Sequence, residues 1–284
     1  MDFLAPAWEL SAMAHAAHNR RSGRRAGGRM FVRTMVVLAV LAVLVYGGIC
    51  ASLYFGQRSL VYQPEPSWLV RQPPDFELVR DGVHLRGWVM NPGKPRALLY
   101  FGGNAERIED SREELARWLP DRTIYLLPYR GFGASDGKPS EAALVGDAIA
   151  LFDKVAPSHT AVAVLGRSLG SGVAVQLAAQ RPVERLVLVT PFDSLVRVAA
   201  GYYPWAPVNL LMRERFESWR HAAAISSPVL VIRAEHDEVI PAARTDALIA
   251  AFGQRPAQQV VADAGHNTIQ DFADYRVSLE RFLH

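Results

Sequence analysis

Short apolar runs recur along the chain from residue 84 onward, and stretches with helical spacing separate them. The runs lie at 84–90, 97–103, 123–128, 161–166, 185–190 and 229–234, with a weaker candidate at 258–263. Most of them are apolar at successive positions, which is typical of strands buried on both faces of a parallel sheet. Helical patterns lie at 105–119, 140–155, 169–181, 242–252 and 267–283. This alternation predicts an α/β fold, with a mostly parallel sheet and helices on both of its faces.

An uncharged stretch, TMVVLAVLAVLVYGGICASLYF, occupies residues 34–55. At about 1.5 Å per helical residue, it is long enough to cross a hydrocarbon core of about 30 Å. Arg33 and five earlier arginines precede it, and basic residues usually stay on the cytoplasmic side of a membrane span. We therefore expect a single-pass transmembrane anchor at 34–55, with a cytoplasmic N-terminus and the rest of the chain exported to the periplasmic or extracellular side.

A cleaved signal peptide, cut after Ala51, is the alternative interpretation of this stretch. The apolar region of a signal peptide usually has about 7–15 residues, which is fewer than 34–55 contains, so we favour an uncleaved anchor. Residues 1–33 show no sustained periodicity and include RRSGRRAGGR, which predicts a disordered basic tail. Met30 and Met35 are alternative starts of translation.

The charges of the chain are distributed unevenly. Residues 1–33 hold six of the 31 basic and two of the 28 acidic residues, which leaves 25 basic and 26 acidic residues in the remainder. A nucleic-acid surface needs clustered basic residues on the folded domain, so we expect no nucleic-acid partner. Cys50 is the single cysteine, so the chain cannot form an internal disulfide or a cysteine metal site.

Prolines are frequent between the uncharged stretch and the first strand candidate. Proline disfavours both helix interiors and central strands. We therefore predict an extended tether at 56–75 and one domain at 76–284.

The segment GRSLG, residues 166–170, fits the pattern G-x-S-x-G. The pattern alone is weak, but here an apolar strand candidate precedes it and an alanine-rich helical pattern follows it. In such a strand-turn-helix setting, a strained turn lifts the serine hydroxyl above the C-terminal edge of the sheet. The small glycines allow the strand and the helix to approach each other closely. Ser168 is therefore the candidate nucleophile.

A serine hydroxyl needs a base that takes its proton, and the base needs an acid that orients it. In chains with this type of turn the order is serine, acid, histidine. His266 follows the last strand candidate in ADAGHNT, and Asp237 follows the run at 229–234 in AEHDEVIP. We predict His266 as the base and Asp237 as the acid, while the neighbouring Glu235 and Glu238 have the simpler interpretation of solvated loop residues.

An oxyanion hole needs two backbone N–H groups directed at the developing negative charge. One usually comes from the residue after the nucleophile, here Leu169, and the other from the loop after the third strand. That loop reads FGGNAE, residues 101–106, and we predict the N–H of Asn104 as the second donor. As an alternative role for its side chain, Asn104 is also a candidate helix N-cap.

These motifs together resemble the α/β-hydrolase superfamily. They are most similar to its single-pass, membrane-anchored branch of ABHD-type hydrolases, which is often labelled serine aminopeptidase-like. The similarity runs from about Gln57 to the C-terminus through FGQRSLVYQP, YFGGNAE, YRGFGASDGKPSE, GRSLGSGVAVQLA, TPFDSL, YYPWAPVNLLMRERFES, AEHDEVIP and AGHN. The resemblance implies an α/β-hydrolase fold with Ser168, Asp237 and His266 as the triad and Asn104 and Leu169 as oxyanion donors.

This chain departs from the family pattern at one position, and the resemblance implies one further structural feature. The family usually has a histidine that helps to fix the oxyanion loop where this chain has Gly102. The family also has a short helical cap, which we expect at about 191–227. The aromatic side chains of this segment either cover an apolar acyl pocket or pack against the core. Asp193, at its start, is a candidate helix N-cap.

We expect a serine hydrolase that cleaves carboxylic ester or thioester bonds through an acyl-enzyme, with lipid or acyl compounds among its candidate substrates. Such a reaction requires neither a metal nor an organic cofactor. A peptidase or an acyltransferase would use the same triad, and a non-catalytic membrane-tethered binding protein would keep only the fold. The complete set of Ser168, Asp237 and His266 favours the enzyme.

Overall fold

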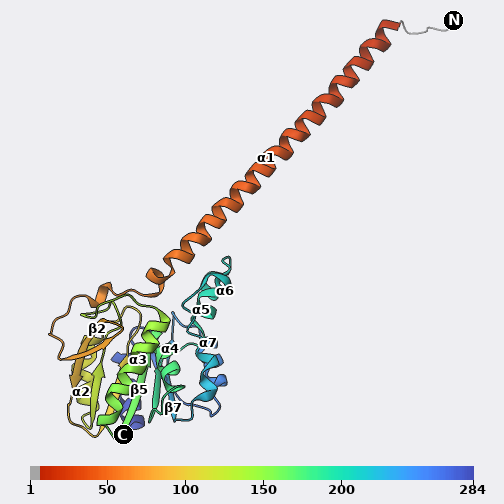
Figure 1. The fold of residues 1–284 in the computed structure, drawn as a ribbon. Coiled ribbons are helices and arrows are strands. Elements are labelled where there is room, and N and C mark those ends of the chain that lie inside the picture. The colour runs from red at the N-terminus through yellow and green to blue at the C-terminus, as the bar shows by residue number, and fades with distance from the viewer. Residues whose placement is uncertain (1–6) are drawn as a thin grey trace. The chain divides into compact units, whose positions relative to one another are not determined.

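The computed structural model describes residues 7–284 of the chain, with side chains from Met30 onward (Figure 1). The chain divides into two compact units, one ending at Phe55 and the other spanning Gly56–His284. Helix α1 (Ala7–Val61) includes residues 7–33, for which the sequence predicts disorder. Alanine and arginine both favour helices, which is consistent with a helical backbone in this part of the chain. Residues 1–6 lie outside the described residues.

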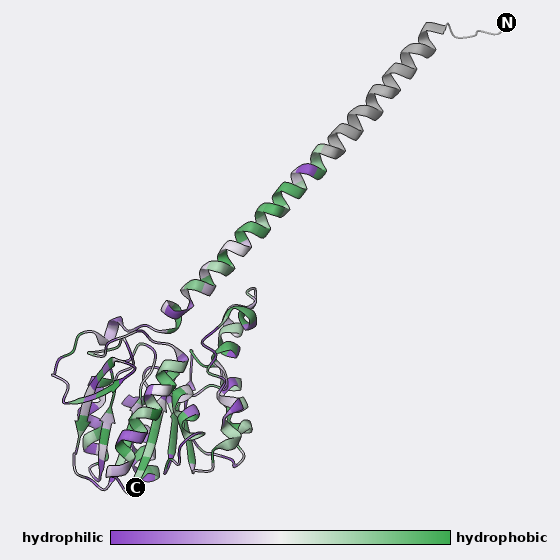
Figure 2. Cartoon of the chain, viewed as in Figure 1, coloured by the Kyte–Doolittle hydropathy of each residue, from purple (hydrophilic) through white to green (hydrophobic). Residues whose placement is uncertain are grey.

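The apolar part of α1 is a candidate membrane span. Within Met30–Ser67, the most apolar window has a mean hydropathy of 2.5 and none of it is buried against protein. The apolar residues form a green band along the helix in Figure 2. An apolar helix near the N-terminus that meets these criteria can be an uncleaved anchor or part of a signal sequence.

The second unit is built on an eight-stranded sheet. Its strands are β1 (Phe76–Arg80), β2 (Val83–Met90), β3 (Arg96–Phe101), β4 (Arg122–Leu126), β5 (Ala161–Arg167), β6 (Leu186–Val189), β7 (Val229–His236) and β8 (Ala257–Gly265). Their order across the sheet is β1-β2-β4-β3-β5-β6-β7-β8, in which β2 runs antiparallel to both neighbours and all other pairs are parallel. The prediction of a mostly parallel sheet is confirmed, and β1 is an additional edge strand.

Helices cover both faces of this sheet. They are α2 (Arg112–Trp118), α3 (Glu141–Val155), α4 (Leu169–Ala178), α5 (Leu195–Tyr202), α6 (Val208–Leu211), α7 (Ala242–Ala251) and α8 (Ala273–Leu283). Figure 1 shows α3 and α4 side by side over the central strands. In β5, Val162 and Val164 pack into the core on the face of α3 and α4, whereas Ala163 and Leu165 pack into the core on the face of α2 and α8. This double burial explains why residues 162–165 of the strand are apolar at successive positions.

Helix α4 lies unusually close to β3 and β5 because two glycines face each other there. A Cβ on Gly170 would overlap the carbonyl oxygen of Phe101, and a Cβ on Gly166 would lie 2.6 Å from the Cβ of Ala174. Any larger residue at either position would push the helix away from the strands. The two glycines of GRSLG therefore set the distance between the turn at Ser168 and the sheet.

The segment after the apolar helix belongs to the second unit, where the sequence predicts an extended tether. Helix α1 continues to Val61, and Tyr62 is only 2% exposed. The Gln57 side chain pairs with backbone groups of the cap, since its Nε2 donates to the Leu211 carbonyl at 3.1 Å and its Oε1 accepts the Arg213 N–H at 2.6 Å. The proline content thus indicated the end of the helix but not these contacts with distant residues.

Glu214 holds this segment to the cap from inside the protein. Its carboxylate is 3% exposed and accepts hydrogen bonds from Arg58 Nε at 2.8 Å, Tyr62 Oη at 2.7 Å and the Glu141 N–H at 2.5 Å. A buried carboxylate needs such partners because an unpaired charge is strongly disfavoured away from water. Residues 57–62, the cap and the start of α3 therefore meet at one carboxylate.

The expected cap lies between β6 and β7 and contains α5, α6 and two short 3₁₀ helices, Ser218–Arg220 and Ala222–Ala224. Phe216 is fully buried against Gly172, where an added Cβ would lie 2.8 Å from its ring. Four cap residues are instead at least half exposed: Tyr202, Tyr203, Trp205 and Leu210. The cap thus packs on the core through the rings of Phe192 and Phe216 and exposes several others.

Asp193 is not the helix N-cap that the sequence suggests. The N-cap of α5 is Ser194, and no side chain caps the first turn. The buried Asp193 carboxylate instead accepts hydrogen bonds from Arg197 at 2.6 Å and Arg244 at 3.4 Å. Arg244 is distant in the sequence, so local spacing gave no sign of this contact.

The glycine contact gives a stability prediction. Gly170→Ala should lower the free energy of unfolding by about 3 kcal/mol or more, because the added methyl group overlaps backbone that cannot move independently. Gly201→Ala is the matched control, since it also lies in a helix but has open space around its Cβ position. It should leave stability unchanged or raise it by about 0.5–1 kcal/mol. Urea unfolding of both variants measures the difference, and equal stabilities would contradict the proposed close approach.

Candidate active site

The three predicted triad residues each follow a strand directly. Ser168 follows β5, Asp237 follows β7 and His266 follows β8. These strands are parallel, so their C-terminal ends meet at one edge of the sheet. Ligands of open α/β sheets bind at this edge. The order of the strands therefore brings together residues that are 98 positions apart.

The backbone at Ser168 has the strained turn that the motif predicts. Its φ of 50° and ψ of −116° are unusual for a residue with a side chain. The turn is held by the Ser168 N–H, which donates to the Val189 carbonyl at 2.9 Å, and by Ser171 Oγ, which donates to the Ser168 carbonyl at 2.6 Å. These bonds place the serine between the end of β5 and the first turn of α4.

Ser168, His266 and Asp237 form a continuous chain of hydrogen bonds. His266 Nε2 lies 2.9 Å from Ser168 Oγ, and His266 Nδ1 lies 2.9 and 3.0 Å from the two carboxylate oxygens of Asp237. His266 is only 4% exposed, so water does not compete strongly for either nitrogen. An Nδ1–H that donates to the carboxylate leaves Nε2 as the acceptor for the serine proton.

The Asp237 carboxylate is oriented by its own loop. Its Oδ1 also accepts the N–H groups of Val239 at 3.0 Å and Ile240 at 2.7 Å. In addition, Tyr202 Oη donates to the Val239 carbonyl at 2.9 Å. A residue of the cap thus supports the loop that holds the candidate acid.

Glu238 is exposed, as the sequence suggested, and it also contributes a contact to the site. Its Oε2 accepts the backbone N–H of His266 at 3.0 Å. This bond holds the pKa of the Glu238 carboxyl below its usual value. The contact joins the acid loop to the base loop, and its sequence separation of 28 residues explains why local patterns did not predict it.

The predicted oxyanion loop lies beside Ser168 and is held from several sides. Tyr129 Oη donates to the Gly102 carbonyl at 2.9 Å. The Asn104 side chain donates to the Val61 carbonyl at 3.2 Å, and the Asn104 carbonyl accepts the Gln63 N–H at 3.0 Å. The Asn104 side chain therefore contacts the end of α1, and it is not the helix N-cap considered from the sequence.

The N–H groups of Asn104 and Leu169, the two predicted oxyanion donors, have no acceptor assigned among the described residues. A Cβ on Gly103, which precedes Asn104, would lie 3.7 Å from the Ser168 Cβ. Leu169 is the first residue of α4, and the first N–H groups of a helix have no acceptor within it. The structure thus brings both donors next to Ser168.

Gly102, the departure from the family pattern, has a steric explanation. A Cβ at this position would overlap the Ile108 side chain and lie 3.2 Å from the carboxylate of Glu106. The space in which a histidine would lie is therefore occupied by two other side chains. The glycine does not leave the loop unsupported.

The described residues contain one group that could hold a metal ion. Glu235, His236 and Asp263 have ligand atoms within 4.8 Å of one another, and all three side chains are exposed. Glu235 already accepts the Asp263 N–H at 3.0 Å. Exposed groups of this kind commonly occur without an ion, and the predicted triad contains none of the three.

Comparison with known proteins identifies the family. The family model described as "Serine aminopeptidase, S33" matches residues 96–216, which include the oxyanion loop and the turn at Ser168. The esterase Pf2001 of Pyrococcus furiosus has the same fold, with a TM-score of 0.61 over 78% of this chain and 93% of its own, at 18% sequence identity. The chain is an α/β-hydrolase.

Curated relatives extend over most of this α/β-hydrolase. The uncharacterized protein MT2364 of Mycobacterium tuberculosis is 36% identical over 88% of this chain and 95% of its own length. The α/β-hydrolase domain-containing protein WAV2 of Arabidopsis thaliana is 27% identical over 70% of this chain and 76% of its own. The similarity to MT2364 covers more of the chain than the family model does.

The oxyanion loop gives a second stability prediction. Gly102→Ala should lower the free energy of unfolding by about 1–3 kcal/mol, because its methyl group displaces the Ile108 and Glu106 side chains. Gly103→Ala, at the next position, meets only ordinary van der Waals contacts and should have a smaller effect. Thermal unfolding of the two variants compares them directly. A more stable Gly102→Ala protein would show that this position is not crowded.

Proposed function

We propose that this α/β-hydrolase is a serine hydrolase that cleaves carboxylic ester or thioester bonds. The proposal is carried by the hydrogen bonds that link Ser168 to His266 and His266 to Asp237. A serine hydroxyl within 2.9 Å of an imidazole nitrogen has a base in reach of its proton. Lipids and other acyl compounds are the substrate classes that we favour, since the candidate membrane span would keep the protein near them.

The proposed reaction begins with Ser168 Oγ attacking the acyl carbon while His266 Nε2 takes its proton. The Asp237 carboxylate stabilises the imidazolium that results. When the tetrahedral species collapses, His266 gives the proton to the leaving alkoxide or thiolate, and an acyl-enzyme remains. Water then attacks the acyl carbon with the help of His266, which releases the acid and restores Ser168.

The developing negative charge would be stabilised by the N–H groups of Asn104 and Leu169. These donors come from two separate elements, the loop after β3 and the first turn of α4. The N-terminal end of a helix also carries partial positive charge. Loss of one such donor typically costs about 10²–10³ in rate.

Activity-based labelling tests the nucleophile. A fluorophosphonate probe should label the wild-type protein and leave Ser168→Ala unlabelled, because only the activated serine attacks phosphorus. Asp237→Asn should react about 10⁴-fold more slowly, since the amide no longer favours the required histidine tautomer. Circular dichroism checks that both variants are folded. Equal labelling of wild type and Ser168→Ala, or no labelling of folded wild type, would refute the assignment.

Hydrolysis assays then separate esters from amides. A series of p-nitrophenyl esters of increasing chain length should be cleaved by wild type and not by Ser168→Ala. The serine aminopeptidase description of the family model makes aminoacyl p-nitroanilides the appropriate comparison. Faster turnover of the anilides would make the protein a peptidase and contradict the ester preference.

We further propose that residues 34–55 are an uncleaved anchor and that the hydrolase unit is exported. With a tag at the N-terminus, the full-length protein should remain in the membrane fraction with its tag attached. Protease added to spheroplasts should digest the hydrolase unit and spare the tag. A released hydrolase unit without the tag would indicate a cleaved signal peptide, and a protected hydrolase unit would reverse the proposed orientation.

A further inference from the structure

Glu106 is the last residue of the predicted oxyanion loop and has no role in the predicted triad. Its side chain is 12% exposed, and three groups from different elements donate hydrogen bonds to its carboxylate. These donors are the hydroxyl of Tyr100 on β3, the N–H of Gly103 at 2.7 Å and Arg167 Nη1 at 2.9 Å. A buried carboxylate with three donors is held firmly in one position.

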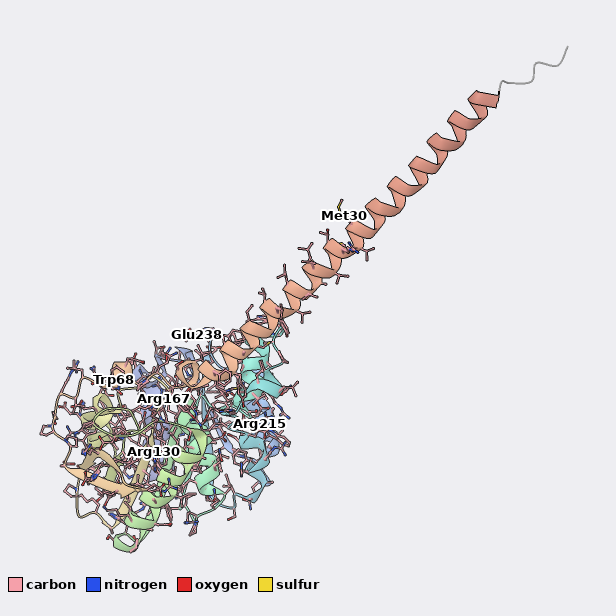
Figure 3. All side chains as sticks on the ribbon, turned by 45° about the horizontal axis from the view of Figure 1, so that its top comes forward. Met30, Trp68, Arg130, Arg167, Arg215 and Glu238 are labelled. Atoms are coloured by element: carbon pink, nitrogen blue, oxygen red, sulfur yellow. The ribbon has the colours of Figure 1, made fainter. Side chains whose placement is uncertain are left out.

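Arg167 connects this carboxylate to the rest of the site. It is the last residue of β5 and directly precedes Ser168 (Arg167 is labelled in Figure 3). While Nη1 binds Glu106, Nη2 donates to the carbonyl of His266 at 3.3 Å. The ion pair therefore links the oxyanion loop, the turn at the nucleophile and the loop of the base.

Arg167 stays charged and Tyr100 keeps its proton near neutral pH. Burial opposes the charged form of Arg167, but the nearby Glu106 carboxylate outweighs it and raises the pKa of the guanidinium above its usual value. Burial and the same carboxylate raise the pKa of the Tyr100 hydroxyl, so that it keeps its proton and remains a donor. Removing either partner of a buried ion pair leaves the other without compensation.

The bond from Gly103 determines which amide of the loop is available to substrate. Because Glu106 accepts the Gly103 N–H, this amide is already engaged by the carboxylate. The next amide, that of Asn104, has no assigned acceptor among the described residues. Glu106 also occupies the space beside Gly102, where the family usually has the histidine that fixes this loop.

We propose that Glu106, acting with Arg167, is a positioning residue that fixes the Asn104 amide and His266 relative to Ser168. The proposal rests on the proposed function, because it assigns a role in the serine hydrolase reaction. Displacing a reacting group by about 1 Å can cost about 10²-fold in rate. We therefore expect Glu106 to influence mainly kcat, since the carboxylate does not contact the substrate.

A groove beside the pair offers a way to test this role chemically. It has a volume of about 340 Å³, and its lining includes Glu106, Arg167, Tyr100, Tyr275 and Glu114. If Glu106 is shortened to alanine, a small carboxylate such as formate can enter from the groove and bind the same donors. Chemical rescue of this kind would not be expected if Glu106 only filled space.

The experiment compares Glu106→Ala and Glu106→Gln with Glu114→Ala in the full-length protein. Glu114 lines the same groove but has no assigned hydrogen bond to the three loops among the described residues. With a short p-nitrophenyl ester, Glu106→Ala should lose about 10²-fold in kcat with little change in KM. Formate, but not chloride at equal ionic strength, should restore part of this loss, and Glu114→Ala should behave like wild type.

Glu106→Gln keeps the shape of the side chain and removes its charge, which makes it the second variant if Glu106→Ala does not fold. Its kcat should fall at least about tenfold, since a neutral acceptor holds Arg167 less tightly. If the folded variants react with fluorophosphonate at the wild-type rate, the positioning role is wrong while the proposed function stands. If wild type itself is neither labelled nor active, both proposals fail together.

Discussion

The arrangement of the candidate site depends on the close approach of α4 to β3 and β5. Gly166 and Gly170 permit this approach because neither carries a Cβ, and the carbonyl of Phe101 lies where a side chain on Gly170 would be. The approach brings the first turn of α4, and with it Leu169, beside the loop that follows β3. The close contact between Gly170 and the Phe101 backbone thus brings the two candidate oxyanion donors, Leu169 and Asn104, to the same side of the sheet as Ser168.

A second level of organisation comes from side chains that join the loops at the ends of the strands. Glu238 binds the backbone of His266, and Arg167 binds the same residue at its carbonyl. Glu106 extends the set to the oxyanion loop. All three of these bonds end on backbone groups of the loops. They therefore restrict the loop backbones as well as the side chains that the loops carry.

Much of the fold and the candidate triad could be predicted from the sequence, because both depend on local patterns. A buried parallel strand is apolar throughout, and the nucleophile, acid and base each follow such a strand. Glu106 and Asp193 were beyond this reasoning, because the arginines that join them to distant segments, Arg167 and Arg244, meet them only after folding. A charged residue in a loop looks solvated in the sequence whether or not an arginine from another strand meets it.

The same limit applies to residues 56–75, where prolines suggested a tether. Proline content describes what the backbone can do locally, and it contains no information about the buried Glu214 that binds Arg58 and Tyr62. The exposed cap aromatics are a comparable case. Their composition suggested either a lid or core packing, and the structure assigns Phe192 and Phe216 to the core. The side chains of Tyr202, Tyr203 and Trp205 are at least half exposed.

The carboxylate of Glu214 has a practical consequence for anyone who wishes to make the hydrolase unit without its apolar helix. A protein that starts at the first strand, at Phe76, would lack Arg58 and Tyr62. These two side chains donate hydrogen bonds to the buried carboxylate of Glu214. Such a protein would also lose the Gln57 contacts that pair with the backbone at Leu211 and Arg213. The boundary that keeps the folded unit whole is therefore Gly56, immediately after the apolar stretch ends.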